Sequence, residues 1–345
     1  MFRRILPILL IPLFSVLVCL SVSDQSTVTA AQETAAWQTA PGPTGGSVAA
    51  VAVSPDFTAD QTAFAAVRGR GVQRSEDGGF KWLPAGPDGW YVNDLVLSPD
   101  FANDEKLFVA AGLPTTTTSV QRSSDGGRTW QAATFAAPVI DGRTLVISPA
   151  FASDQTLYLV TGGVPQVSVD GGATFAAAEG WLSTQAVKAL ALASDQVLFA
   201  ATSGPGEGIY RSLNGGTDWV LVRGGSFTAV AASPAYAADS IVLALDSSGQ
   251  LHRSANGGTS WSTPTLTVSS GGTETIAFSP TFASDKVVLA AGSLDGGPYI
   301  SVDGGLTWSK SGWYDPADTL NNGLIGGAVF DLAPAPNQDF SGVLL

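Results

Sequence analysis

The sequence predicts an all-β chain in which one four-stranded antiparallel unit is repeated. Three observations lead to this prediction. An eight-residue phrase that begins with Ser and closes with Trp or Phe occurs six times, at intervals of 42 to 48 residues. A second phrase, Ser-Pro-x-Phe or Ser-Pro-x-Tyr, recurs between these copies. The chain of 345 residues contains 40 Gly and only 13% charged residues, which is typical of a Gly-rich β protein and not of a disordered one.

The eight-residue phrase has the chemistry of a tight turn. Its copies are SEDGGFKW (75–82), SSDGGRTW (123–130), SVDGGATF (168–175), SLNGGTDW (212–219), SANGGTSW (254–261) and SVDGGLTW (301–308). Gly-Gly supplies the positive φ angles of a hairpin, and the closing aromatic residue is expected to be buried between strands. The third residue accepts hydrogen bonds from the turn backbone; it is Asp77, Asp125, Asp170, Asn214, Asn256 or Asp303. Because neutral Asn serves at two places, we assign these six residues a structural role and neither catalysis nor metal binding.

The second phrase marks the turn between the first two strands of each unit. Its copies begin at Ser54, Ser98, Ser148, Ser233 and Ser279, and a shortened form lies at 193–195. Pro ends the preceding strand because it has no N–H for the ladder, and Ser and Asp satisfy backbone groups of the loop. Each unit then reads strand, Ser-Pro loop, strand, loop, short strand, hairpin, strand. Four strands in a repeat of this length are typical of one blade of a β-propeller.

The number of units predicts the size of the ring. First strands are expected to begin near residues 48, 92, 144, 187, 227, 275 and 328. We therefore predict a seven-bladed β-propeller of four-stranded antiparallel blades over residues 31–345, with six full repeats and a truncated seventh. The last blade is incomplete because the sequence ends inside its second strand. Trp37 is expected to begin an outer strand that pairs with the last blade and so closes the ring. The alternatives are that something else completes the last blade, or that the sequence is a fragment of a longer chain with more blades.

The eight-residue phrase resembles the Asp-box, also called the bacterial neuraminidase repeat (BNR), with its pattern Ser-x-Asp-x-Gly-x-Thr-Trp. Families that carry it include sialidases, sortilin ectodomains, xyloglucanases and the photosystem II assembly-factor propellers. In these families the box lies on the hairpin between the third and fourth strands of a blade. The resemblance implies the same position here, and it is compatible with enzymes and binding proteins alike, because both carry the box.

Residues 1–30 are expected to be a signal peptide. Arg3 and Arg4 precede an apolar run at 5–20, and 28–30 offer a small-residue cleavage site. The alternatives are a twin-arginine signal, a lipoprotein modified at Cys19, and an uncleaved anchor. The sequence thus predicts a secreted or cell-envelope protein, with membrane attachment only through an uncleaved or lipidated N-terminus. The net charge of −13 argues against nucleic acid as a partner, and we expect a monomer.

A ligand site is expected on the face of the disc that carries the segments differing between units. These are the loops between second and third strands and the connections between blades. Three Gly-Trp pairs close to carboxylates lie there, and the predicted ligand-binding residues are Asp88, Trp90, Tyr91, Glu179, Trp181, Trp313, Tyr314 and Asp315. The alternative role of these tryptophans is to wedge neighbouring blades together. Loop arginines such as Arg68 and Arg223 could bind carboxylates.

The sequence favours a non-enzymatic binding or assembly module for an extracellular protein or glycan. The alternative is an exo-sialidase-like glycoside hydrolase. Sialidases need three convergent arginines, a Tyr–Glu pair and an acidic Asp, and their early Arg-Ile-Pro phrase is missing from this sequence. We assign no catalytic residue, no metal ligand and no cofactor. The single histidine, His252, has no second His with which to share a metal and is assigned a structural role.

Overall fold

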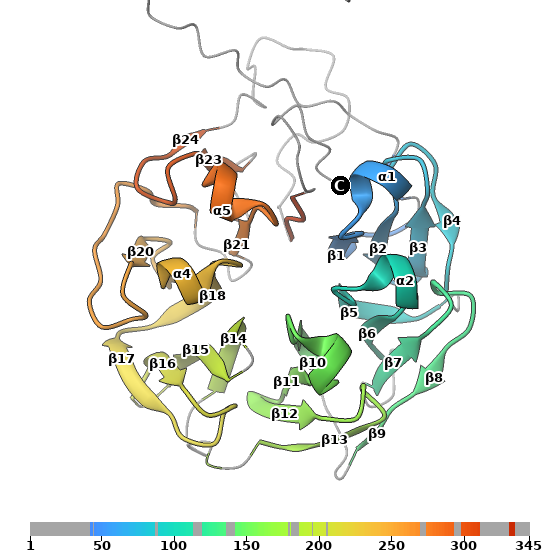
Figure 1. Cartoon of the computed structure of the whole chain (residues 1–345), viewed down its shortest axis with the longest axis horizontal. Coiled ribbons are helices and arrows are strands. Elements are labelled where there is room, and N and C mark those ends of the chain that lie inside the picture. Colours follow the sequence, from blue (N-terminus) through green and yellow to red (C-terminus); the bar gives the residue numbers. More distant parts are fainter. Residues whose placement is uncertain are drawn as a thin grey trace, which may run out of the picture. The chain divides into compact units, whose positions relative to one another are not determined.

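The structure, a computed structural model, describes most of the repeat region. The described residues are 42–43, 45–86, 89–112, 119–135, 142–178, 180, 186–194, 196–204, 206–269, 274–292, 298–310 and 331–334. The chain divides into two compact units, Met1–Glu33 and Thr34–Leu345, and every described residue belongs to the second. Within it the strands form small, mostly antiparallel sheets arranged as the blades of a β-propeller (Figure 1), which confirms the predicted fold class.

In the first three sheets the strands follow the sequence from the innermost outward, except that β9 forms the outer edge of the third (Figure 1). The first contains β1 (Val48–Val53), β2 (Ala63–Val67), β3 (Gly71–Ser75) and β4 (Leu83–Pro84). The second contains β5 (Tyr91–Leu97), β6 (Leu107–Gly112), β7 (Ser119–Ser123) and β8 (Gln131–Ala132). The third contains β10 (Gly142–Ile147), β11 (Leu157–Thr161), β12 (Val164–Ser168) and β13 (Thr174–Ala177), with β9 (Thr134–Phe135) added in parallel to β13.

The remaining sheets follow the same order. The fourth contains β14 (Ala186–Ser194), β15 (Val197–Ser203), β16 (Gly208–Ser212) and β17 (Val220–Gly224). The fifth contains β18 (Phe227–Ala232), β19 (Val242–Asp246) and β20 (Leu251–Ser254). In place of a fourth strand, Ser262 forms an isolated bridge with Arg253 of β20. The sixth contains β21 (Thr275–Phe278), β22 (Val288–Ala291), β23 (Tyr299–Ser301) and β24 (Ser309–Lys310).

The described residues form six blades, so the prediction of seven is not met. Of the seventh unit only residues 331–334 are described, and they form no strand. Leu332 is nonetheless buried, in one cluster with Leu289 and Ala291 of β22. Trp37 and residues 335–345, which were expected to belong to the last blade, lie outside the described residues. Within the described residues, therefore, no strand pairing supports a seventh sheet.

Each Ser-Pro phrase closes into a single helical turn, where the sequence predicted a loop. The turns are α1 (Phe57–Asp60), α2 (Phe101–Asp104), α3 (Phe151–Asp154), α4 (Tyr236–Asp239) and α5 (Phe282–Asp285). In the first, the Ser54 hydroxyl donates to Asp60 Oδ2 (2.6 Å), and Asp60 Oδ1 accepts from the Thr62 N–H (2.8 Å). Phe57 is buried beneath the turn. The phrase therefore satisfies its own polar groups, and its aromatic residue is buried in four of the five turns, while Tyr236 of α4 is half-buried.

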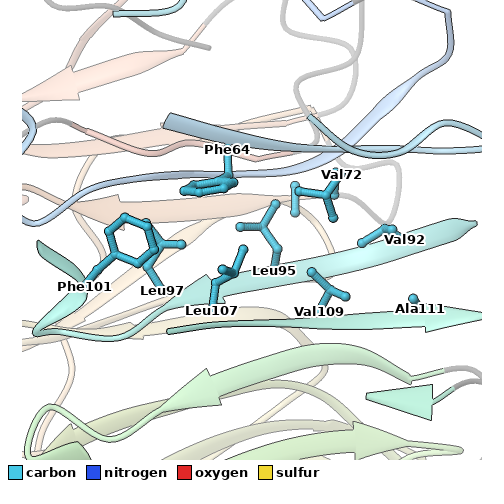
Figure 2. Packing of buried hydrophobic residues seen from close by; sticks show 11 residues of the cluster. Phe64, Val72, Val92, Leu95, Leu97, Phe101, Leu107, Val109 and Ala111 are labelled. Atoms are coloured by element: carbon cyan, nitrogen blue, oxygen red, sulfur yellow. The ribbon is translucent and has the colours of Figure 1, made fainter. Parts of the chain in front are cut away.

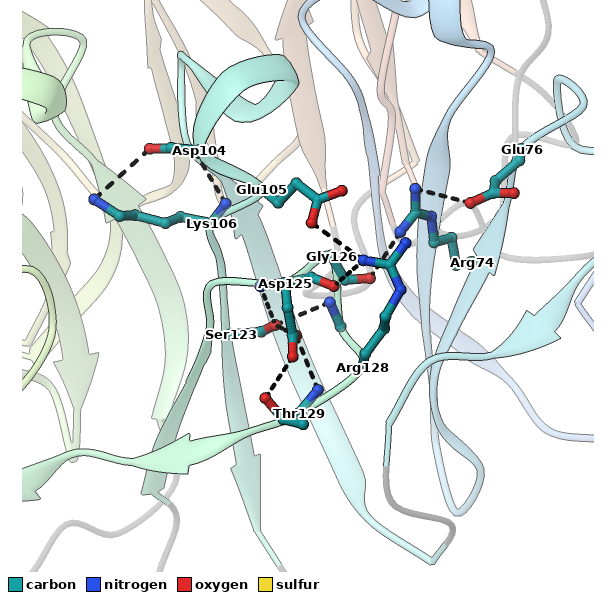
Figure 3. A network of polar contacts seen from close by, with 11 residues as sticks. Arg74, Glu76, Asp104, Glu105, Lys106, Ser123, Asp125, Gly126, Arg128 and Thr129 are labelled. Carbon is teal, nitrogen blue, oxygen red and sulfur yellow. Dashed lines mark hydrogen bonds and ion pairs between the residues drawn. The ribbon is translucent and has the colours of Figure 1, made fainter.

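The Asp-box hairpins are held together by the hydroxyl of their first residue (Figure 3). In the second blade, Ser123 is buried; its Oγ accepts from the Gly127 N–H (2.9 Å) and donates to Asp125 Oδ1 (2.7 Å). Asp125 also accepts from the N–H and the hydroxyl of Thr129 (2.9 and 2.5 Å). Gly126 and Gly127 have φ angles of 67° and 89°. The serine bond recurs in all six boxes, and in each the third residue accepts from the backbone N–H four residues later.

The two asparagine boxes differ from the others in one matching change. In three of the four Asp boxes, a Thr hydroxyl four residues later donates to the Asp, at 129, 174 and 307; the first box has Lys81 at this place. Where the box carries Asn, the Asn amide donates instead, from Asn214 to Asp218 Oδ2 (2.8 Å) and from Asn256 to Ser260 Oγ (2.9 Å). The hydrogen-bond direction is thus set by the pair of residues and not by the third residue alone.

The hydrophobic core lies between consecutive blades. Phe64 and Val72 of the first blade pack in one cluster with Leu95, Leu107 and Val109 of the second (Figure 2). The closing aromatic residues of the boxes were expected to be buried; Phe175 is, but the five tryptophans are only half-buried. Each indole N–H donates to the carbonyl of the second box glycine, which holds the ring edge at the turn surface.

Three of the four arginines that stand directly before a box serine join neighbouring blades, while Arg122 bonds to Gln131 of its own blade. Arg74 donates to the carbonyl of Gly126, Arg211 to that of Gly257 and Arg253 to that of Gly304, at 3.1, 2.6 and 2.7 Å. In each pair the glycine is the first one of the next box. Tyr158 makes the equivalent bond to Gly215 (3.0 Å). The recurrence of Arg, which the sequence could only place within a blade, thus reflects a contact between blades.

The buried box hydroxyl should matter more than the acidic residue beside it. We expect Ser123→Ala to lower the free energy of unfolding by about 1–3 kcal/mol, because the Gly127 N–H loses its acceptor in a buried position. Asp125→Asn should have a small effect, since Asn already serves at 214 and 256. Urea denaturation measures both. The matched control is Ser124→Ala, at the exposed neighbour, and equal losses for Ser123→Ala and Ser124→Ala would contradict the assignment.

Candidate functional site

The innermost strands surround a central cavity of about 740 Å³, which we call the channel. All six described blades contribute to its lining, as does Asp331. The polar lining residues are Arg68, Tyr91, Asn93, Asp94, Thr144, Lys188, Thr228, Glu274, Thr275 and Asp331. Arg68, Tyr91 and Lys188 are exposed to solvent. A ligand at this position would meet hydroxyls, an amide and charges of both signs.

Bulges in the innermost strands explain this polar lining. The register of pairing shifts near the start of five of them, between residues 48 and 50, 92 and 94, 142 and 144, 187 and 189, and 227 and 229. In a regular strand only alternate residues would face the channel, whereas a bulge inserts one extra residue. Consecutive pairs such as Asn93–Asp94 and Lys188–Ala189 therefore both line it.

Asp94 connects two blades beside the channel. Its Oδ2 accepts from the Leu145 N–H of the third blade (2.7 Å), and its Oδ1 accepts from the Leu95 N–H (2.8 Å). Innermost strands have an edge without a pairing strand, so their N–H groups need other acceptors. The two carboxylate oxygens of Asp94 accept from two such N–H groups, and the bond to Leu145 joins the second blade to the third.

Asp331 makes the same two bonds to its own neighbours. Its Oδ2 accepts from the Val51 N–H (3.0 Å) of the first blade and its Oδ1 from the Leu332 N–H (2.8 Å). Asp331 therefore bonds to Val51 and to its own neighbour Leu332. Asp94 bonds in the same way to Leu145 and to its own neighbour Leu95.

Both channel carboxylates resist ionisation. Burial and, to a smaller extent, the charge of Asp331 together raise the pKa of Asp94 to about 8, against the opposing effect of the hydrogen bonds from Leu145 and Leu95. Burial likewise raises the pKa of Asp331 to about 6, against the hydrogen bonds from Val51 and Leu332. The box aspartates behave in the opposite way, since hydrogen bonds led by that of the Thr129 side chain lower the pKa of Asp125 to about 2.

The predicted ligand-binding residues are only partly described. Tyr91 is 44% exposed and lines the channel. Trp90, directly before it, is half-buried and packs edge-to-face on Trp130, with 6.4 Å between ring centroids, beside a separate hollow between the first two blades. The other predicted residues lie outside the described part of the chain: Asp88, Glu179, Trp181, Trp313, Tyr314 and Asp315. Trp90 and Tyr91 thus serve two different hollows.

His252 lies in a polar network between the fourth and fifth blades. Its Nδ1 is 3.3 Å from Arg223 Nη2, and its Nε2 is 2.9 Å from Asp246 Oδ2. The ring is 6% exposed and packs edge-to-face on Phe227. This places His252 in a bridge between blades and Arg223 away from the channel lining.

The described residues contain neither a metal site nor a membrane-spanning helix. No group of His, Cys, Asp and Glu in this part of the chain could hold a metal ion. Within the same residues, no helix has the length and apolar character needed to cross a membrane.

Comparison with known proteins supports the fold and one repeat. A family model described as "BNR/Asp-box repeat" matches residues 299–310. No curated protein matches the chain. Solved structures do: GH74 enzymes from Niastella koreensis (16% identity, TM-score 0.57) and Xanthomonas campestris, the latter a xyloglucanase (18%, 0.58), and a structure titled "YCF48 bound to D1 peptide" (15%, 0.56). In the order given, the three matches cover 77%, 80% and 79% of this chain. They cover 45%, 46% and 82% of the length of the matched chains.

At these identities the likeness shows only the fold, that of a BNR-type β-propeller. It carries no information about activity. The chain spans about half the length of the GH74 structures that it matches.

The channel residues could have been found in the sequence from the register of the repeats. The residue four places before each Ser-Pro serine is Ala50, Asp94, Thr144, Ala229 or Thr275, and all five line the channel. Sequence reasoning looked instead for aromatic residues in the variable loops.

The stability of the protein should fall as pH rises from about 4 to 8. A carboxyl group whose pKa is higher in the folded state than in the unfolded state stabilises below its unfolded value, near 3.9, and that stability is lost as pH rises through the folded value. Asp94 and Asp331, with pKa values of about 8 and 6, both act in this window. The box residues Asp125, Asp170 and Asp303, with pKa values of about 2, lose their contribution only below pH 4.

Urea denaturation at pH 5 and pH 8.5 measures the effect. Asp94→Asn should reduce the difference between the two free energies of unfolding, because the titrating group is removed. Asp125→Asn is the matched control and should leave the difference unchanged. A difference that Asp94→Asn does not alter would contradict the raised pKa of Asp94.

Proposed function

We propose that this protein is a non-enzymatic binding or assembly module that holds a protein segment or a glycan at the mouth of its channel. The observation that carries the proposal is the bulged lining, because bulges deliver two side chains per strand to one cavity. Polar groups of several kinds around a preformed hollow are typical of ligand sites. The proposed contacts at the mouth are Arg68, Tyr91 and Lys188, which are the exposed members of the polar lining.

The bonding of the channel carboxylates favours binding over catalysis. A nucleophile or general base needs a carboxylate oxygen that can reach the substrate. Both oxygens of Asp94 and both oxygens of Asp331 already accept from backbone N–H groups, and one bond of each aspartate joins two blades. Among the described lining residues the cations are Arg68 and Lys188, fewer than the three arginines that sialidases bring to their substrate.

The structural neighbours are compatible with a single-propeller binding module. The YCF48 structure was solved with a peptide, and the match covers 82% of that chain. For the xyloglucanase the match covers 46% of the enzyme, so this chain accounts for less than half of a GH74 architecture. The exo-sialidase-like hydrolase remains the alternative function.

We also propose that residues 331–334 occupy the place of an innermost strand in a seventh blade. The support is that Asp331 bonds to the first blade as Asp94 bonds to the third, and that Leu332 packs on the sixth. Under this proposal the channel is bounded by seven innermost segments.

The signal-peptide character of residues 1–30 supports export, so the proposed partner is an extracellular or envelope protein or a glycan, and the module is proposed to act as a monomer. Nucleic acid is excluded from the proposal by the net charge of −13.

Substitutions at the channel mouth should weaken binding without loosening the fold. The purified chain without residues 1–30 is used on a glycan array and in a pull-down from its own envelope fraction, and the affinity of a captured ligand is measured. Tyr91→Ala and Lys188→Ala should each weaken it at least about fivefold. Thr217→Ala, exposed on a box hairpin, is the control with unchanged affinity. Equal affinity of all three variants and the parent would contradict a site at the channel mouth.

The alternative function has a direct assay. We expect no release of 4-methylumbelliferone from its α-sialoside by the purified chain, because the described channel lining lacks the arginine set. Release that Arg68→Ala abolishes would refute the non-enzymatic proposal in favour of the hydrolase. Arg128→Ala, at the rim of the disc, serves as the control for general effects of removing an arginine.

A further inference from the structure

A second cavity, of about 820 Å³, lies between the first two blades. It is lined by β4, by Trp90 and by the box hairpin of the second blade, and we call it the blade 1–2 groove. The hollow between the second and third blades, at Lys106, Arg122 and Gln131, has only about 100 Å³. The groove is therefore not a general consequence of stacking blades.

Two hydrogen bonds in opposite directions fix the walls of the groove. Arg74 of the first blade donates to the Gly126 carbonyl of the second (3.1 Å, Figure 3), and the Trp130 indole of the second donates to the Ala85 carbonyl of the first (2.9 Å). The walls meet so closely at Gly127 that a Cβ there would lie 2.9 Å from the Ala85 oxygen. The groove is thus held open at a set width before any ligand arrives, which lowers the entropic cost of binding.

The inner part of the groove is apolar. Trp90 and Trp130 stand edge-to-face, with 65° between their ring planes, and pack on the core cluster of the first two blades. Leu83, 54% exposed, and the exposed Pro84 extend this surface along β4. Aromatic side chains offer a large, rigid contact area at low cost in conformational entropy.

The rim of the groove carries charges of both signs in near balance. Arg74, Lys81 and Arg128 line it together with Glu76 and Asp77. The Arg74 guanidinium pairs with Glu76 (2.9 Å), and the Arg128 guanidinium pairs with Glu105 (3.1 Å), as Figure 3 shows. A ligand with a strong net charge would be repelled by one of the two sets, so the lining fits a neutral ligand that both donates and accepts hydrogen bonds.

We propose that the blade 1–2 groove is a second binding site, separate from the channel, and that its ligand is a neutral oligosaccharide. A sugar ring has an apolar C–H face that can lie on an indole. Its hydroxyls donate to carboxylates and accept from guanidinium and amide groups, which Glu76, Arg128 and Gln121 supply here. The proposal does not rest on the proposed function, because the groove and the channel share no lining residue.

The test uses calorimetric titration of the purified chain with four probes: cellotetraose, xylotetraose, mannotetraose and galactotetraose. At least one should bind with a Kd below about 10 mM. Trp90→Ala should weaken that binding at least about tenfold, and Arg128→Ala, at a 62% exposed side chain, at least about threefold. Tyr91→Ala, in the channel, is the control and should leave it unchanged, which separates this site from the one proposed above.

Melting temperatures identify a Trp90→Ala variant that fails to fold, and Arg128→Ala then decides alone. Absence of binding by all four probes would overturn the proposal. So would binding that both groove variants leave unchanged, or binding that only Tyr91→Ala weakens. Tighter binding of tetragalacturonic acid than of every neutral probe would also overturn it, because the groove would then prefer an anionic ligand to a neutral one.

Discussion

The contact between one blade and the next box hairpin is the constraint on which this structure depends. A four-stranded sheet cannot bury its faces alone, so each blade is stable only when stacked on its neighbours. The arginine at the end of the third strand reaches the first glycine of the next box, and the space for this contact exists because glycine has no side chain. The buried box serine accepts from the N–H of the second glycine of the pair, and both glycines of the box are left-handed. The box is therefore both a turn within its blade and the receiving surface for the blade before it.

Stacking by this contact leaves the innermost strands with an edge that faces the channel. Their N–H groups are satisfied partly by carboxylates such as Asp94, and bulges turn additional side chains toward the cavity. The polar channel thus follows from the need to satisfy an edge, and its lining can vary between blades without changing the stacking. At the outer side, the first two blades also enclose the blade 1–2 groove, where the Trp130 indole donates to the Ala85 carbonyl across the gap. The scaffold therefore creates two hollows with different chemistry.

Much of the fold could be predicted from the sequence because its signals are local. Strand starts expected near 48, 187, 227 and 275 agree closely with β1, β14, β18 and β21, and the roles of Ser and Asp in the two phrases follow from turn chemistry. The helical turn after each Ser-Pro could not be predicted, since four residues carry no helical period. The contacts of Arg74 and Arg211 were missed because they connect residues 52 and 46 positions apart.

The candidate site was harder to predict for a geometric reason. Neighbouring residues of an extended chain face opposite sides, so Trp90 and Tyr91 could not form one platform. A bulge changes that rule locally, and only an alignment of the repeats with one another indicates which positions then face the channel. The channel pair Asp94 and Asp331 was therefore overlooked, although both precede a leucine in the same register of their repeats.

Hydrogen–deuterium exchange of the purified chain, with and without a partner captured from its envelope fraction, would test most directly whether the channel mouth is the binding surface. The account predicts new protection in residues 91–94, 186–190 and 227–230, at the start of β5, β14 and β18. The box hairpins at 168–175 and 254–261 should exchange at unchanged rates. Protection confined to those hairpins, with the channel strands unaffected, would contradict it.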